Sequence, residues 1–249
     1  MDVFNPFTLE GKTILVTGAS SGIGRAIATA CSRMGATIVA TGRNFQKLEA
    51  TMGSLDGEAN LVFSADLTKI EDIKNLAINV PKLDGVVHCA GIGHRMPAKL
   101  LTEAEVDKVM KSNFMSAVSF QTELMNAKKI NKASSIVFVA SAAPQMPAFG
   151  NAAYTASKAA IIGYAKCLAL ELAPRGIRVN CICPAMVWTD LIMQGGVGKE
   201  ELEQAQQKYP LKRYGQPEDV ANLAIYLLSD ASQWMTNSCI DITGGTNEL

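Results

Sequence analysis

The sequence contains few of the residues that build metal centres or disulfide frameworks. It has two histidines, His88 and His94, among 249 residues, and its six cysteines include no Cys-x-x-Cys pair. The cysteines fall mostly in apolar segments, which is typical of buried free thiols in a reducing compartment. We therefore expect no bound metal and no disulfide framework. His94 follows a glycine turn, where it either lines a pocket or is a loop residue without a role.

The chain also lacks net charge and long apolar runs. Lys and Arg together number 23, as do Asp and Glu, so we expect no general attraction for nucleic acid or anionic membranes. No apolar run has the length needed to span a bilayer, and the first residues lack the basic-then-apolar pattern of a secretory leader. These absences predict a cytoplasmic protein that binds neither nucleic acid nor membrane.

Apolar residues are abundant, at 48% of the chain, which is enough for one large core. No shift in composition marks a second domain, so we expect a single domain over residues 1–249. Short apolar segments predict strands, and a helix between the first two makes them parallel. The expected strands cover residues 12–17, 36–41, 60–64, 84–89, 136–140, 177–183 and 238–242.

A glycine-rich turn follows the first expected strand and opens a helix that runs to about Met34. Glycines let the backbone approach a ligand, while the N–H groups and dipole of the helix start favour its negative charge. The segment therefore predicts a site for the phosphates of a cofactor. Its expected contacts are Gly18, Ser20, Ser21, Gly22, Ile23 and Gly24.

The residues after the second strand bear on the choice of cofactor. An acidic residue at this point of a dinucleotide fold binds the ribose hydroxyls, whereas an arginine can pair with a 2′-phosphate. The chain has Arg43 and Asn44 here and no carboxylate, which favours NADP(H) over NAD(H). The remaining expected cofactor contacts follow other strands: Asp66, Leu67, Cys89, Ala90, Gly91, Pro184, Val187 and Thr189.

Three side chains around residues 140–158 suggest proton chemistry. Tyr154 and Lys158 are four residues apart in an expected helix, so they share one face, and the ammonium favours the phenolate form of the tyrosine. Ser141, at the end of the preceding strand, could reach the same substrate oxygen. Asn113, inside the helical tract 102–127, suggests a polar task such as holding a water or bending the helix.

Taken in order, these segments resemble the short-chain dehydrogenase/reductase family over nearly the whole chain. The resemblance rests on the 17–24 turn, Cys89-Ala90-Gly91, Asn113, Ser141, Tyr154-Thr-Ala-Ser-Lys158 and the 178–184 strand. It implies a Rossmann-like, doubly wound, seven-stranded parallel sheet with helices on both faces and a nicotinamide dinucleotide. It also implies a Ser-Tyr-Lys site with an assisting Asn. Two positions depart from the family pattern: Cys89 stands for a usual asparagine, and Ala185 for a frequent glycine.

This resemblance implies a carbonyl–alcohol oxidoreductase. Tyr154 would give a proton to the substrate oxygen that Ser141 holds. Lys158 would also bond the nicotinamide ribose, and Asn113 would support a water leading to it. A polar segment over about 186–215 is expected to be a lid over the substrate. Candidate substrate contacts, mainly apolar, are Ser141, Ala143, Gln145, Met146, Tyr154, Met186 and Trp188.

An apolar pocket suits an acyl chain or another hydrophobic ketone, and the sequence is similar to beta-ketoacyl-carrier-protein reductases. Such an enzyme would have an acidic acyl carrier protein as partner, for which Lys128, Lys129, Lys132 and Arg175 could form a basic rim. Alternatives are a dehydrogenase of another hydrophobic alcohol, steroid or sugar, a sugar-nucleotide epimerase, and a non-catalytic dinucleotide-binding redox sensor. The family also implies a homodimer or homotetramer formed through helices around 102–127 and 152–174.

Overall fold

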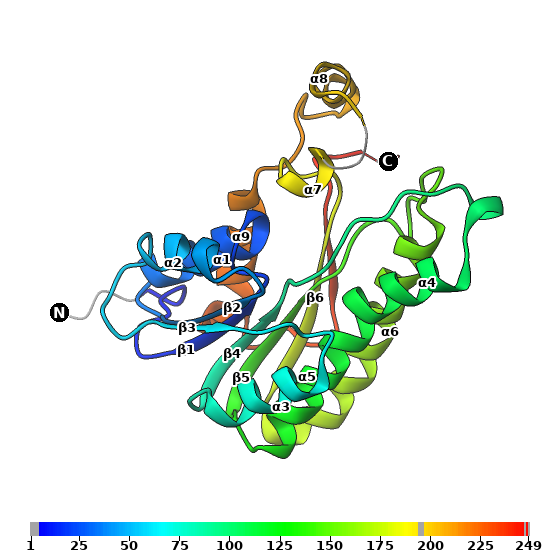
Figure 1. The fold of residues 1–249 in the computed structure, drawn as a ribbon. Helices are drawn as coiled ribbons and strands as arrows, with labels where there is room; N and C mark the ends of the chain where they lie inside the picture. Colours follow the sequence, from blue (N-terminus) through cyan, green and yellow to red (C-terminus); the bar gives the residue numbers. More distant parts are fainter. Residues whose placement is uncertain (1–4, 194–196, 247, 249) are drawn as a thin grey trace.

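A computed structural model describes residues 5–193, 197–246 and 248 of the chain. Within these residues seven strands form one parallel sheet in the order β3-β2-β1-β4-β5-β6-β7 (Figure 1). The strands are β1 (Thr13–Thr17), β2 (Thr37–Gly42), β3 (Leu61–Ser64), β4 (Leu83–His88), β5 (Ile130–Val139), β6 (Arg178–Pro184) and β7 (Cys239–Ile242). The predicted Rossmann-like α/β fold is confirmed.

Helices cover both faces of this sheet (Figure 1). One layer contains α1 (Gly22–Arg33), α2 (Phe45–Met52) and α9 (Pro217–Leu228), and the other contains α3 (Ile70–Asn79), α5 (Ser116–Asn126) and α6 (Ala152–Leu172). Val16 and Ile27 belong to the core of the first layer, whereas Phe120, Phe138 and Ile161 belong to the core of the second. Strands covered on both faces are apolar along both sides, as the short apolar segments of the sequence indicated.

The remaining helical segments lie outside these two layers or at the ends of other helices. They are η1 (Ala98–Leu100), α4 (Glu103–Met110), η2 (Lys111–Met115), η3 (Ala173–Arg175), α7 (Asp190–Met193), α8 (Lys199–Ala205), η4 (Gln206–Lys208) and η5 (Asp230–Ser232). The expected helical tract 102–127 is therefore α4, a π-helical turn and α5 in succession. The strand expected over 136–140 begins earlier, at Ile130, because its polar first half hides it from a search for apolar runs.

The strand order reverses between β1 and β4. β2 and β3 extend the sheet on one side of this pair, and β5, β6 and β7 extend it on the other. In open parallel sheets, ligands bind outside the carboxyl ends of the strands at such a switch point. The carboxyl ends of β1 and β4 carry Gly18 and Cys89-Ala90, which places two of the predicted cofactor segments together.

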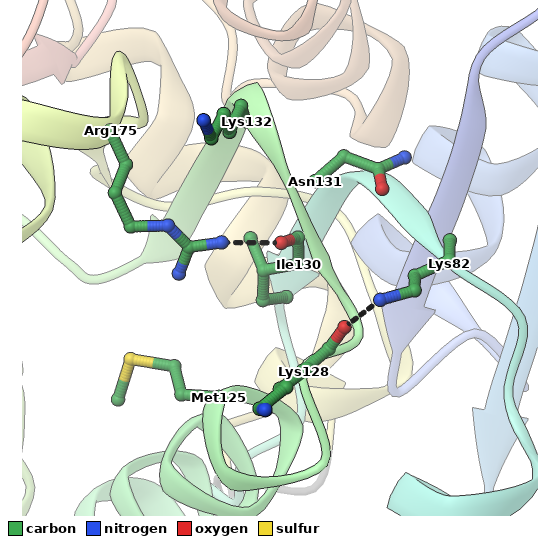
Figure 2. Close-up of a pocket in the computed structure, with 7 residues that line it drawn as sticks. All are labelled: Lys82, Met125, Lys128, Ile130, Asn131, Lys132 and Arg175. Carbon is green, nitrogen blue, oxygen red and sulfur yellow. Dashed lines mark hydrogen bonds between the residues drawn. The ribbon is translucent and has the colours of Figure 1, made fainter.

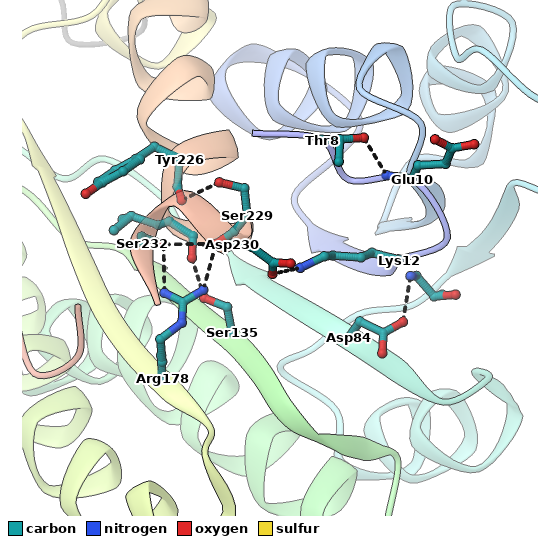
Figure 3. Close-up of polar contacts among 12 residues, drawn as sticks. Thr8, Glu10, Lys12, Asp84, Ser135, Arg178, Tyr226, Ser229, Asp230 and Ser232 are labelled. Atoms are coloured by element: carbon teal, nitrogen blue, oxygen red, sulfur yellow. Dashed lines mark hydrogen bonds and ion pairs between the residues drawn. The ribbon is translucent and has the colours of Figure 1, made fainter. Parts of the chain in front are cut away.

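The opposite, amino-terminal edge of the sheet is held by structural polar contacts (Figure 3). The Arg178 guanidinium donates to the Ser232 hydroxyl at 2.9 Å and to the Ser229 carbonyl at 3.2 Å. Lys12 pairs with Asp230 at 2.6 Å. Arg178 belongs to one of the segments that carry the family resemblance, and its contacts show that its task there is to join β6 to the end of α9.

Two structural properties bear on the kinds of site the molecule can carry. No helix in the described ranges is long and apolar enough to cross a membrane. Among the same residues, no group of three or more His, Cys, Asp or Glu side chains is arranged so that it could hold a metal ion.

Candidate active site

The glycine turn between β1 and α1 is built so that only glycine fits at its key positions. Gly18 and Gly22 have φ of +69° and +52°, which side chains rarely adopt. A Cβ on Gly24 would stand 2.3 Å from the Gly18 carbonyl oxygen. Ser21 precedes the helix with an extended backbone, but no described side chain caps the first turn, which carries no acidic residue. The N–H groups of this turn are thus available to an anionic group, as a dinucleotide phosphate requires.

Thr17 joins the ends of β1 and β4 beside this turn. Its hydroxyl accepts hydrogen bonds from the backbone N–H groups of Cys89 at 2.9 Å and Ala90 at 3.1 Å. A Cβ on Gly18 would lie 3.0 Å from the Ala90 Cα, so the two segments pass in close contact. Thr17 was part of the recognised motif, but the sequence alone did not identify this task for its side chain.

Two consecutive elements, joined by a hydrogen bond of Lys158, carry Ser141, Tyr154 and Lys158. Ser141 lies just beyond the end of β5, and the other two lie in the first turns of α6. The Lys158 ammonium donates to the Val139 carbonyl at 2.9 Å and lies 5.8 Å from the centroid of the Tyr154 ring. Both Ser141 and Lys158 are buried, at 6% and 7% exposure. The Ser141 hydroxyl accepts from the Ala143 N–H at 3.1 Å, which leaves its own O–H to donate elsewhere.

Asn113 lies in the π-helical turn between α4 and α5, and its side chain is buried. Its Oδ1 accepts from the Ile92 N–H at 2.7 Å, while its Nδ2 donates to the Ile92 carbonyl and to the Ser157 hydroxyl, both at 3.1 Å. A Cβ on Gly91 would lie 3.1 Å from Asn113 Oδ1 and 3.8 Å from Lys158 Nζ. The side chain thus fastens the turn after β4 to α6, next to the lysine. Nothing in the sequence pointed to Ser157 as its partner.

The adenosine end of the predicted cofactor site lies beyond β2 and β3. Arg43 is exposed there, and the side chain of Asn44 caps α2 by accepting from the Lys47 N–H at 2.9 Å. Partial burial raises the pKa of Asp66, but bonds from Thr68 and the charges of Arg43 and Lys69 outweigh it and hold that pKa below its usual value. Asp66 is therefore an ionised carboxylate whose charge interacts favourably with that of Arg43.

The segment after β6 lies close to the glycine turn. The Thr189 Cγ2 would stand 3.2 Å from a Cβ on Gly22, so Thr189 faces the start of α1. The Pro184 carbonyl accepts from the Ala142 N–H at 2.9 Å, which ties this segment to the loop that carries Ser141. Val187 is buried and pairs with Gly215. The structure therefore brings the expected nicotinamide-end residues to the same edge as Ser141.

The expected lid, residues 186–215, leaves and rejoins the body of the molecule at one place; its residues 194–196 lie outside the described ranges. The Trp188 N–H donates to the Gly215 carbonyl, and the Gly215 N–H donates to the Met186 carbonyl, both at 2.9 Å. Leu202, Tyr209 and Tyr214 form a separate apolar cluster inside the segment.

Two predicted substrate contacts lie near this lid cluster. The Trp188 indole packs against Tyr214 with ring centroids 5.4 Å apart, and its N–H donates to Gln206 at 3.1 Å. Met186 also packs against the cluster. Of the candidates in the loop after Ser141, Ala143 is buried, Met146 is half-buried and Gln145 is exposed. His94, on the loop after β4, pairs with Glu105 at 2.9 Å and so has a structural partner.

The expected basic rim does not border these residues. Lys128, Lys132 and Arg175, with Lys82 and Asn131, line a hollow of about 460 Å³ at the amino-terminal edge of the sheet (Figure 2). The hollow lies where β5 begins and Ser141 lies just beyond the end of this strand, so the two are at opposite ends of β5. Three of the four residues expected to form a basic rim for a carrier protein thus do lie together, but where β5 begins, whereas the candidate active-site residues lie where it ends.

Comparisons with known proteins agree with this geometry. A family model described as Enoyl-(Acyl carrier protein) reductase matches residues 18–247. The chain is 35% identical over 237 residues to the 3-oxoacyl-(acyl-carrier-protein) reductase FabG of Rickettsia felis, with 95% of this chain and 97% of the relative covered. It is 31% identical to the human Dehydrogenase/reductase SDR family member 4, with 96% and 88% covered.

Solved structures lead to the same family. A dehydrogenase/reductase from Sinorhizobium meliloti is 31% identical, with a TM-score of 0.89 and 96% of each chain covered. A protein from Beutenbergia cavernae, described as an NAD(P)-dependent gluconate 5-dehydrogenase with bound NADP, is 31% identical, with a TM-score of 0.88 and 97% and 98% covered. The chain belongs to the short-chain dehydrogenase/reductase family and is an oxidoreductase of that family.

Proposed function

We propose that the protein interconverts a carbonyl group and a secondary alcohol, with NADP(H) as its preferred cofactor. The observation that carries this proposal is that Lys158, beside the Tyr154 ring, bonds the carboxyl end of β5, which Ser141 follows, on the edge of the sheet where the glycine turn opens α1. A phenol next to a buried ammonium is suited to proton exchange with a substrate oxygen. The adjoining helix start is suited to an anionic cofactor.

Each side chain has a separate task in the proposed reaction. A nicotinamide dinucleotide, when bound, supplies or accepts the hydride. Tyr154 donates its phenolic proton to the substrate oxygen, and the Ser141 hydroxyl donates a hydrogen bond to the same oxygen and holds it. Lys158, anchored on the Val139 carbonyl at 2.9 Å, stabilises the phenolate that proton transfer leaves behind.

Asn113 acts as a positioning residue in this proposal. Through Ile92 and Ser157 it fixes the turn after β4 against α6, and its side-chain N–H groups both have protein partners. Because both of these N–H groups are occupied, they are not available to donate to the expected water on the path to Lys158.

Arg43 supports the preference for NADP(H). It stands at the end of β2, where the ribose of a dinucleotide lies in folds of this class, and its charge is exposed to a ligand. A guanidinium can pair with a 2′-phosphate through two parallel hydrogen bonds.

Matched titrations with NADPH and NADH test the cofactor preference. We expect the wild type to bind NADPH more tightly, and Arg43→Ala to weaken NADPH binding by about tenfold to a hundredfold, because a charge-assisted pair is lost. NADH binding should change little. Arg33→Ala, which removes an exposed cation at the far end of α1, is the control and should alter neither affinity. Equal affinities of the wild type for the two cofactors would refute the assignment.

We infer that the substrate is a hydrophobic carbonyl compound, in the first place a 3-oxoacyl thioester. The curated relatives with this activity match the chain nearly end to end, and the loop after Ser141 offers apolar residues such as Ala143 and Met146. An acyl carrier protein would then be the partner. The basic hollow lies at the opposite end of β5 from Ser141, so a carrier docked there would not cover the loop that carries Ser141 in the same chain.

A turnover panel distinguishes this substrate from the alternatives. NADPH consumption is followed with an acetoacetyl thioester, the same acyl group on its carrier protein, hydrophobic ketones, a steroid and sugars. Turnover of the thioester, faster on the carrier, supports the proposal. Turnover restricted to a ketone, steroid or sugar would replace the thioester, and cofactor binding without any turnover would favour a redox sensor.

The proposed enzyme is a cytoplasmic homodimer or homotetramer. Three large apolar side chains are exposed in the single chain: Val106 on α4 at 36%, Met115 on η2 at 54% and Leu170 on α6 at 69%. Exposed apolar groups on neighbouring helices favour an interface with another copy. Light scattering on the purified protein measures the number of subunits directly.

A further inference from the structure

Two cysteines face each other across the last pair of strands. Cys181 of β6 is paired in register with Cys239 of β7, and the Cys181 N–H donates to the Ser238 carbonyl at 2.8 Å. Cys181 is buried and Cys239 is half-buried. Residues paired in register on parallel strands direct their side chains to the same face of the sheet, so the two thiols are neighbours. Neighbouring strands are about 4.8 Å apart, which is within the Cα separation that a disulfide tolerates.

The two thiols differ in acidity. The interaction with the neighbouring Cys181 thiol lowers the pKa of the Cys239 thiol. Partial burial and Asp241 oppose this effect, and the Lys166 charge adds to it. The same contact and burial raise the pKa of Cys181. Cys239 is thus the better source of a thiolate, which is the reactive form, and Cys181 is a protonated partner in contact with it.

Other buried thiols in the chain are less suited to oxidation. Burial raises the pKa of Cys31, Cys89 and Cys183 to about 12, so these thiols stay protonated at neutral pH. Cys167 is exposed on α6, but a single surface thiol has no neighbour to form an intramolecular disulfide. The β6–β7 pair therefore combines access, acidity and a resolving partner.

We propose that Cys181 and Cys239 form a reversible disulfide when the protein meets a hydroperoxide. The Cys239 thiolate attacks one peroxide oxygen and, after protonation of the leaving hydroxide, gives a sulfenic acid and one water. The Cys181 thiol then attacks the Cys239 sulfur, the S–S bond forms, and the sulfenic oxygen leaves as a second water with the thiol proton. Two thiols are oxidised by two electrons, and one hydrogen peroxide is reduced to two waters.

The position of the pair explains why the bond should be reversible and why it would matter. Cys239 is half-buried, and exposed disulfides are among those most readily reduced, so a reductant can reopen the bond. Two residues further along β6, the Cys183 thiol lies against the backbone N–H of Ser141. A bond that fixes β6 to β7 therefore acts on the strand that supports the candidate active site.

Thiol counting and peptide mapping test the proposal on the full-length protein. Hydrogen peroxide should lower the number of free thiols per chain from the original six by two. Mass spectrometry should then find a peptide that joins Cys181 to Cys239, and dithiothreitol should restore the original number of thiols. In the Cys239→Ser variant, the same peroxide treatment should not remove two free thiols. Cys167→Ser, the matched control on the surface of α6, should lose two as the wild type does.

Several outcomes would overturn the proposal. They are a wild-type protein in which peroxide forms no Cys181–Cys239 peptide, a cross-link that joins other cysteines, and a Cys239→Ser variant that still loses two thiols. Peptide mapping of the wild type does not depend on how the variants fold. Non-reducing electrophoresis separates this bond from one between chains through Cys167, since only the latter doubles the apparent mass.

Discussion

Single atoms decide whether the cofactor turn can form. The Gly24 position faces the Gly18 carbonyl so closely that a Cβ would stand 2.3 Å from the oxygen. No side-chain rotation relieves that contact, because the backbone fixes the position of a Cβ and the Gly18 oxygen is itself a backbone atom. By contrast, a Cβ on Gly163, in the middle of α6, would meet nothing within 4 Å.

These two glycines give a matched pair of substitutions. Gly24→Ala should lower the free energy of unfolding by about 3 kcal/mol, since the turn must shift, and should weaken NADPH binding at least tenfold. Gly163→Ala should raise the free energy of unfolding by about 0.5–1 kcal/mol, because alanine favours the helix, and should leave binding unchanged. Urea denaturation and cofactor titration measure both effects. Equal behaviour of the two variants would contradict the packing described for the turn.

At this scale the sequence predicted residue types better than partners. Tyr154, Lys158 and Ser141 could be found because a spacing of four and a strand end are visible in one dimension. Thr17 and Ser157 could not be assigned their tasks, because their partners lie 72 and 44 residues away in the chain. Long-range hydrogen bonds leave no periodic signal.

Among the elements, β4 and α5 share a buried polar contact. His88 of β4 lies 2.9 Å from the Gln121 Oε1 of α5 and stacks on Phe138 with ring centroids 4.6 Å apart. Burial lowers the pKa of His88 to about 4, although the bond to Gln121 opposes the shift. His88 is therefore neutral in the folded protein at neutral pH.

This pKa predicts how stability depends on pH. Because the folded value lies below the unfolded value of about 6.5, the contribution is fully present above pH 6.5 and is lost as the pH falls toward 4. At pH 5 the free energy of unfolding should be lower by about 2 kcal/mol than at pH 7 on account of His88.

Replacing both partners isolates the effect. The double variant His88→Phe with Gln121→Leu removes the titrating group without leaving a buried amide unpaired. Urea denaturation at pH 7 and pH 5 should show a smaller loss of stability in the variant than in the wild type. The same loss in both proteins would mean that His88 is not the group that titrates.

The sequence predicted most elements of the sheet and not all of its helices. Apolar segments mark the strands, because helices cover both faces of the sheet. α2 and α3 were not predicted, since their apolar stripes are short and mixed with charge. The π-helical turn at Asn113 was anticipated only as a polar feature within a long helix, because a change of helical pitch leaves no mark in composition.

Over the whole molecule, the two edges of the sheet have different tasks. The carboxyl edge gathers the glycine turn, the ends of β4 and β6, and the Ser-Tyr-Lys residues. The amino edge carries the structural bonds of Arg178 and the basic hollow near Lys132 and Arg175 (Figures 2 and 3). The sequence pointed to the basic residues but not to their place, because sequence position does not tell which end of the sheet a residue occupies in relation to a distant loop.

The most direct test of the account is the Tyr154→Phe variant, measured for cofactor binding and turnover side by side. The substitution keeps the ring and removes the proton, so turnover with the best substrate of the panel should fall by at least about a hundredfold, while NADPH affinity should stay within about twofold of the wild type. Retained NADPH binding shows that the variant is folded. Turnover close to that of the wild type would contradict the assignment of Tyr154 as the proton donor and with it the proposed reaction.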